Sequence, residues 1–237
     1  MTEVINKSKN LIGTLNESSL HRELKEIYKN PGDELEVKLG KYLIDIVREN
    51  LLVEIQIKNF SAIRSKLEFL LQNHRVLLVH PIIRDKWIMS VDLKNNKVMR
   101  RNLSPKHCSF ENIFEELIRI PHLISHPNLI IELVLIQAEE IRVNNGQGSW
   151  RRGGWSIQDI KLIKILQRKV YSNSKQILGL IPDDLNVPFT NRNLANYLKK
   201  PIKLAGMTTY SLRKMGLIEV VGKKERSLLF NFVKNRI

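Results

Sequence analysis

The chain has 237 residues, 43% of them hydrophobic, which indicates a globular protein of one large domain or two small ones and excludes a disordered chain. Its single cysteine, Cys108, excludes an intrachain disulfide and a cysteine-rich zinc site. The formal net charge is +15: residues 146–237 hold 18 Lys and Arg against 5 Asp and Glu, and residues 1–145 hold 21 against 19. This division predicts a basic half that binds a polyanion, with nucleic acid favoured over an anionic membrane.

Residues 1–145 alternate helices and strands. Apolar periodicity, capping residues and turn residues predict the following elements. Helices are expected at residues 16–28, 61–74 and 108–120, and strands at 35–47, 51–60, 75–82, 86–93 and 128–143, with Pro81 breaking the run between the third and fourth strands. Alternation of this kind predicts an α/β (α+β) layer built on a mixed sheet.

The composition changes at NNGQGSWRRGGW, which begins at Asn144. We expect a junction at residues 146–155 between a domain of residues 1–145 and a domain of residues 156–237. In the second domain, helices are predicted at residues 157–170, 174–182 and 190–198, followed by a helix that ends at Gly216 and a strand–turn–strand ribbon. Helices followed by a two-stranded ribbon are typical of a winged helix, which is a small DNA-binding fold.

The hairpin IDIVRENLLVEIQIKNF, residues 44–60, carries the residues with the clearest chemistry. Strand alternation places Glu54, Gln56 and Lys58 on one face, and the turn brings Asp45 near Glu54. Two neighbouring carboxylates raise each other's pKa unless a cation lies between them, and Mg²⁺ prefers carboxylate oxygens. The pattern therefore indicates a divalent-metal site. The alternative is an edge hairpin whose polar face is solvated.

Asp45 followed by Glu54-Ile55-Gln56, in a helix–strand–hairpin–helix setting, resembles the PD-(D/E)XK nuclease superfamily, which has the restriction-endonuclease-like fold. The resemblance covers about residues 15–90. It implies Mg²⁺ or Mn²⁺ bound by Asp45 and Glu54, with Glu23 in the first helix as an additional ligand. It also implies hydrolysis of DNA phosphodiester bonds in defence or DNA processing, and an association into homodimers, because each site cuts one strand.

The sequence departs from the family pattern at one position. The lysine that usually follows the second acid by two residues is Gln56 here. Some members are read instead as Asp followed by Gln-x-Lys, and Gln56-Ile57-Lys58 fits that frame. Both frames stay open, with Gln56 or Lys58 expected to orient the attacking water or to neutralise the phosphate.

The basic half resembles winged-helix DNA-binding domains over about residues 188–235. On its last helix, Ala205, Thr208, Leu212 and Met215 are predicted to face the core. The opposite stripe, which would face a DNA major groove, consists of Lys203, Met207, Tyr210, Arg213 and Lys214. Phosphate contacts are expected from the tip of the ribbon and from the junction, at Lys223, Lys224, Arg226, Arg151 and Arg152. The same fold could instead serve dimerisation or another protein contact.

Localisation follows from what the sequence lacks. MTEVINKSKN has no apolar run after its charges, so it is not typical of a signal peptide. The longest apolar stretch, LIIELVLIQA, is too short for a bilayer and contains Glu132. We expect a soluble cytoplasmic, nucleoid-associated enzyme with no membrane partner. The rival hypothesis is a DNA-binding regulator without activity, whose α/β half dimerises or senses a ligand.

Overall fold

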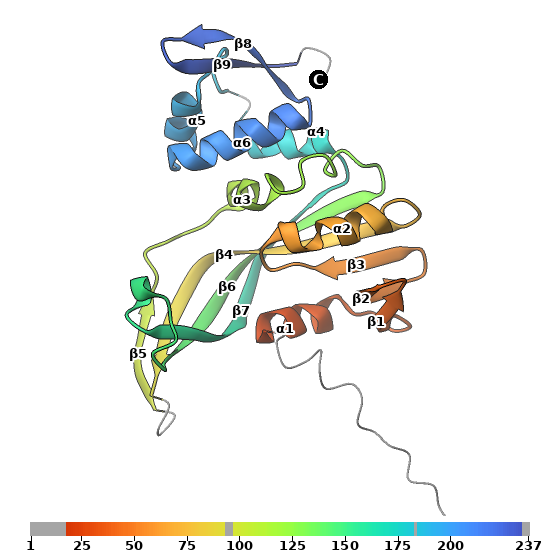
Figure 1. Cartoon of the computed structure of the whole chain (residues 1–237), viewed down its shortest axis with the longest axis vertical. Coiled ribbons are helices and arrows are strands. Elements are labelled where there is room, and N and C mark those ends of the chain that lie inside the picture. Colours follow the sequence, from red (N-terminus) through yellow and green to blue (C-terminus); the bar gives the residue numbers. More distant parts are fainter. Residues whose placement is uncertain (1–17, 93–96, 183, 234–237) are drawn as a thin grey trace, which may run out of the picture.

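The computed structural model describes residues 18–92, 97–182 and 184–233, apart from the side chain of Arg151. The segment MTEVINKSKN lies outside these residues. The fold is a seven-stranded mixed sheet flanked by helices, followed by a helical region with a two-stranded ribbon (Figure 1). Within the described part of the chain, none of the helices is long and apolar enough to cross a membrane.

The first half of the large sheet follows the predicted order, except that the strand predicted at residues 35–47 is two antiparallel strands joined by a turn at Gly40. Its elements are α1 (Ser19–Tyr28), β1 (Glu34–Leu39), β2 (Tyr42–Arg48), β3 (Leu51–Ile55), α2 (Phe60–Leu70) and β4 (Arg75–Val91). The side chain of Ser18 caps α1 by accepting from the His21 N–H. Strands β1, β2 and β3 form an antiparallel meander, and α2 carries the chain over to β4, which runs parallel to β3.

Strand β4 is continuous through Pro81, which corrects the predicted break into two strands. Its pairing with β3 ends at Val79 and its pairing with β5 (Val98–Leu103) begins at Trp87. Pro81 lies between these ladders, where β4 pairs only with β6 (Leu129–Asn144) among the described strands. A proline is tolerated there because no neighbour on that side needs its missing N–H.

The largest correction concerns residues 157–170, which form a strand and not a helix. Strand β7 (Trp155–Tyr171) pairs antiparallel with β6 along its length and is the edge strand of the sheet. Register shifts between β6 and β7 insert extra residues and disturb the two-residue alternation. Ile160, Leu162 and Ile165 still pack on one core. Their spacing of two and then three residues is irregular for a strand and was therefore read as helical periodicity.

This strand also changes how the chain divides. The junction predicted at residues 146–155 connects two paired strands of one sheet and includes the short 3₁₀ turn η3 (Trp150–Arg152). Residues 156–171 thus belong to the sheet and not to the C-terminal region. That region begins with α4 (Ser174–Ile177) and continues through η4 (Leu178–Leu180), α5 (Asn191–Leu198), α6 (Ile202–Lys214), β8 (Ile218–Lys224) and β9 (Ser227–Phe232).

Two cores lie on opposite faces of the sheet (Figure 1). Helix α1 covers one face, with Leu20 and Leu24 against Val53 and Ile55. On the other face lie α2, the 3₁₀ turn η2 (Phe110–Ile113) and α3 (Phe114–Leu117), where a longer helix was predicted. This second core extends without a break into the buried residues of α5 and α6, so the C-terminal region packs on the sheet layer through α3.

Candidate active site

The two acidic residues singled out in the hairpin lie at an irregularity of the sheet. The β1–β2 ladder skips Asp45, and the β2–β3 ladder ends at Ile46 and Val53, just short of both carboxylates. Asp45 Oδ2 accepts a hydrogen bond from the Ile55 N–H at 2.8 Å, so its side chain takes the place of a backbone partner. The strands open at the point where Asp45 and Glu54 meet.

A pocket of about 220 Å³ occupies this opening. Elements α1, β2, β3 and α2 all contribute to it, through His21, Asp45, Glu54, Ile55, Gln56, Ala62, Ile63 and Lys66. His21 Nε2 lies 3.4 Å from Asp45 Oδ2. Burial alone would raise the pKa of Asp45, but the hydrogen bond and charge of His21, the Ile55 N–H and the charge of Lys66 together hold that pKa below its usual range.

The surroundings favour the ionised form of Glu54 less than that of Asp45. It is only 2% exposed, and Lys66 Nζ on α2 lies 2.5 Å from its Oε2. Its Oε1 is buried and has no hydrogen-bond partner among the described residues. Burial and the neighbouring charge of Asp45 raise the pKa of Glu54 to about 7 in spite of Lys66. The pocket therefore holds a carboxylate that is poorly compensated at neutral pH.

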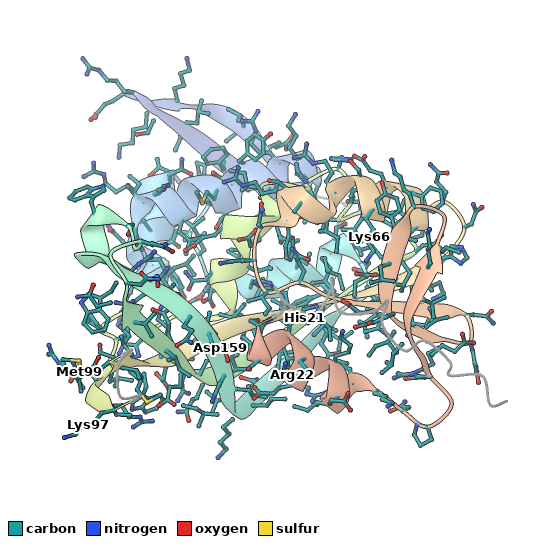
Figure 2. All side chains as sticks on the ribbon, turned by 60° about the horizontal axis from the view of Figure 1, so that its bottom comes forward. His21, Arg22, Lys66, Lys97, Met99 and Asp159 are labelled. Carbon is teal, nitrogen blue, oxygen red and sulfur yellow. The ribbon has the colours of Figure 1, made fainter. Side chains whose placement is uncertain are left out.

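Lys66 and His21 are the two site residues that the sequence analysis did not identify. Lys66 Nζ also donates to the Leu43 carbonyl, which fixes it between β2 and β3. His21 enters the pocket from α1 as a neighbour of Asp45. Figure 2 shows His21 and Lys66 on the two helices that flank the hairpin.

Two predicted members of the site lie elsewhere. Glu23 does not face the pocket: its Oε2 accepts the Leu162 N–H at 2.6 Å and so closes the free edge of β7. Lys58 is exposed and lines a different groove, on the far side of the β3–α2 connection. Gln56 lines the pocket, but its amide nitrogen donates to the carbonyl of Lys58 at 2.6 Å, just before α2 begins.

The donor set of the pocket fits a hard divalent cation. No group of three His, Cys, Asp or Glu side chains among the described residues converges as a ready metal site. Yet Glu54 Oε1 is a buried acceptor without a donor, and it lies beside a second carboxylate. Asp45 and Glu54 supply the oxygen ligands that Mg²⁺ and Mn²⁺ prefer, and a cation between them would relieve both the repulsion and the missing bond.

The C-terminal region places most of its predicted basic residues at the surface. On α6 the inward stripe is buried as predicted: Ala205, Thr208, Leu212 and Met215. The outward stripe divides into two parts. Tyr210, Arg213 and Lys214 are exposed. Lys203 and the half-buried Met207 instead line a groove of about 620 Å³ shared with residues 105–119. The ribbon tip carries its three cations in the open, at Lys223, Lys224 and Arg226.

The tryptophans and arginines of the β6–β7 connection differ in exposure and in the partners they contact. Trp150 is 83% exposed, whereas Trp155 begins β7 and is half-buried. Arg152 donates through Nε to the Trp155 carbonyl at 3.1 Å, which commits it to the turn. The side chain of Arg151 lies outside the described residues.

The fold and pocket define a mixed-sheet domain with an open acidic pocket between its first two helices. The chain belongs to the family described as Domain of unknown function (DUF8091), whose model matches residues 18–172. That range coincides with α1 through β7 and contains the whole pocket. The chain is also similar to a protein from Treponema pallidum (strain Nichols) named "Uncharacterized protein". The two are 30% identical over 177 residues, which cover 73% of this chain and 70% of the relative. No solved structure matches it significantly.

Proposed function

We propose that this protein is a divalent-metal-dependent DNA endonuclease of the PD-(D/E)XK, restriction-endonuclease-like kind. The observation that carries the proposal is the meeting of Asp45, Glu54 and Lys66 in one pocket, with one Glu54 oxygen buried and unbonded. Asp45 and Glu54 each have a donor, the Ile55 N–H and Lys66 respectively, yet the second Glu54 oxygen has none, and burial and Asp45 work against the charge of Glu54. The order α1, β1, the β2–β3 hairpin and α2 supports the same assignment.

Lys66 takes the part that the resemblance gives to the lysine after the second acid. It reaches the pocket from α2, 2.5 Å from Glu54, whereas Lys58 lines another groove. In this proposal its ammonium would face a phosphate oxygen beside the two carboxylates. Gln56 is a positioning residue, because its amide holds the turn from which α2 starts.

Asp45 and Glu54 would hold the cation, Mg²⁺ or Mn²⁺. When bound, the cation would offset negative charge on the phosphate under attack and supply a water with a lowered pKa. Glu54 must lose its proton to serve as a ligand, and its pKa of about 7 makes metal affinity fall as the pH drops below neutral.

The C-terminal region would hold the DNA as a winged helix, with α6 as the recognition helix and the β8–β9 ribbon as the wing. Three exposed cations at the ribbon tip support a phosphate contact. On α6 the base-reading part would be Tyr210, Arg213 and Lys214, because Lys203 and Met207 face residues 105–119.

The test is cleavage of plasmid, duplex, single-stranded and branched DNA with Mg²⁺ or Mn²⁺, against EDTA. We expect metal-dependent cleavage by the wild type and none by Asp45→Asn, which keeps an acceptor for the Ile55 N–H and should stay folded. Glu26→Gln, on the exposed side of α1, is the matched control and should cut normally. Linear product without accumulating nicks would indicate two cooperating copies. A protein that binds DNA but never cuts it would be the regulator of the rival hypothesis.

A further inference from the structure

A second hollow, of about 710 Å³, lies next to the acidic pocket. It lies between the start of α1, the β3–α2 connection and the first half of β7, and it presents more polar than apolar surface. Figure 2 shows Arg22 and Asp159 at this place, on α1 and β7 respectively. This volume is called the α1–β7 groove below.

The charge available in the α1–β7 groove is positive. Arg22, Lys58 and Lys161 line it and are exposed, and within the described chain none of the three has a carboxylate at ion-pair distance. Arg22 makes a hydrogen bond of 3.1 Å to Ser19 Oγ. Three cations from three separate segments therefore face one open volume, and none of them forms an ion pair within the described chain.

The one carboxylate of the groove is already engaged within the fold. Asp159 accepts from the Ser19 N–H at 2.9 Å, the Ser19 hydroxyl at 2.5 Å and the Ile160 N–H at 2.8 Å. Burial would raise the pKa of Asp159, but these donors and the charge of Lys161 outweigh it and hold that pKa below its usual range. Asp159 closes the edge of β7 against α1 and leaves the three cations free to meet an external anion.

The groove and the acidic pocket share two chain segments. Helix α1 gives His21 to the pocket and the next residue, Arg22, to the groove. The connection after β3 gives Gln56 to the pocket and Lys58 to the groove. With a divalent cation held in the pocket, a ligand that occupies both would meet positive charge at successive points along its length, which fits a polynucleotide strand. A small anion would instead need donors that converge on one point.

We propose that the α1–β7 groove binds the phosphate backbone of the nucleic-acid strand whose scissile phosphate lies in the acidic pocket. Arg22, Lys58 and Lys161 contact the phosphates next to the scissile one and set the direction in which the strand leaves the pocket. This inference rests on the proposed function and extends it. It gives Lys58 a role in binding the substrate in place of the catalytic role considered from the sequence.

The test uses the full chain with Lys58 and Lys161 both changed to Ala. Neither side chain lies at ion-pair distance from a carboxylate of the described chain, so the fold should be kept. The matched control changes Lys29 and Lys38 to Ala, two exposed lysines outside the groove. Binding to labelled single-stranded and duplex oligonucleotides is measured by anisotropy in EDTA over a range of salt. The slope of log K against log salt should fall by about two in the groove variant, and the control should match the wild type.

Cleavage kinetics separate this inference from the proposed function. In an active enzyme the groove variant should raise KM with little loss of kcat. When the phosphate next to the scissile one in the DNA is replaced by a neutral methylphosphonate, the groove variant and the wild type should have the same KM. If the protein never cuts DNA but the groove variant binds DNA more weakly than the wild type, the groove is supported as a DNA-binding surface and the nuclease function is rejected. A groove variant that binds and cuts like the control, or a wild type without affinity for DNA, overturns the inference.

Discussion

Replacing Glu54 by Gln should stabilise the protein at alkaline pH while it abolishes cleavage. Glutamine has nearly the shape of a protonated glutamate and can still accept from Lys66. It removes a negative charge that burial and Asp45 disfavour. A residue kept for stability would show the opposite sign, because its loss would weaken the fold. The direction of the effect therefore reports on whether the pocket is a functional site.

The size of the effect follows from the pKa of Glu54, about 7 in the folded chain against an ordinary 4.5. Because the folded-state pKa is raised, folding favours the protonated form, and stability falls as pH rises from the lower value through the higher one. At 1.36 kcal/mol per unit, the loss is about 3 kcal/mol by pH 8 and under about 1 kcal/mol at pH 5. Glu54→Gln avoids this loss, so it should exceed the wild type by about 3 kcal/mol at pH 8.

Urea denaturation followed by circular dichroism, in EDTA at pH 5 and at pH 8, measures this difference. Glu26→Gln should leave the free energy of unfolding unchanged at both pH values. Saturating Mg²⁺ should stabilise the wild type at pH 8 but not Glu54→Gln, because only the wild type offers the second carboxylate. If Glu54→Gln is no more stable than the wild type at pH 8, or gains equally at both pH values, the account of Glu54 is refuted.

Two further predictions concern the cations. Lys66→Met should lower kcat by a factor of at least about 100, whereas Lys58→Met should mainly raise KM. Single-turnover cleavage distinguishes the two effects. The opposite pattern would support the Gln-x-Lys frame, in which Lys58 is the catalytic lysine. Removing the cations at the ribbon tip should lower the salt slope of DNA binding by up to about three, as measured by anisotropy, and an unchanged slope would exclude a wing contact. The variants are Lys223→Ala, Lys224→Ala and Arg226→Ala combined.

Local pattern was sufficient for the β2–β3 hairpin and for the buried face of α6. The hairpin was predictable because Asp45 and Glu54 are nine residues apart around one turn, so strand pairing alone brings them together. The inward stripe of α6 was predictable for the same reason, because helical spacing within thirteen residues determines which side chains share a face. In both cases the information lies within one or two adjacent elements.

Strand β7 could not be predicted in this way. Its register shifts against β6 depend on a partner strand whose sequence is separate, and they disturb the alternation by which a strand is recognised. Glu23 was expected in the site from the family resemblance, and with residues 157–170 read as a helix, nothing suggested a sheet edge for its carboxylate to close. The wrong element moved the domain boundary and hid the partner that Glu23 has in the structure.

The position of Lys66 toward the sheet could have been predicted from helical spacing in α2. The buried residues of α2 are Phe60, Ile63, Leu67 and Leu70, and position 66 lies one turn from Ile63 on the same side. A lysine on the core side of a helix must bury its stem and find an anion for its ammonium. The carboxylate on the sheet face under α2 is Glu54, which pairs with it at 2.5 Å and yet keeps a raised pKa. Lys66 lowers that pKa, but burial and the charge of Asp45 outweigh it, so the carboxylate remains poorly compensated even with a lysine beside it.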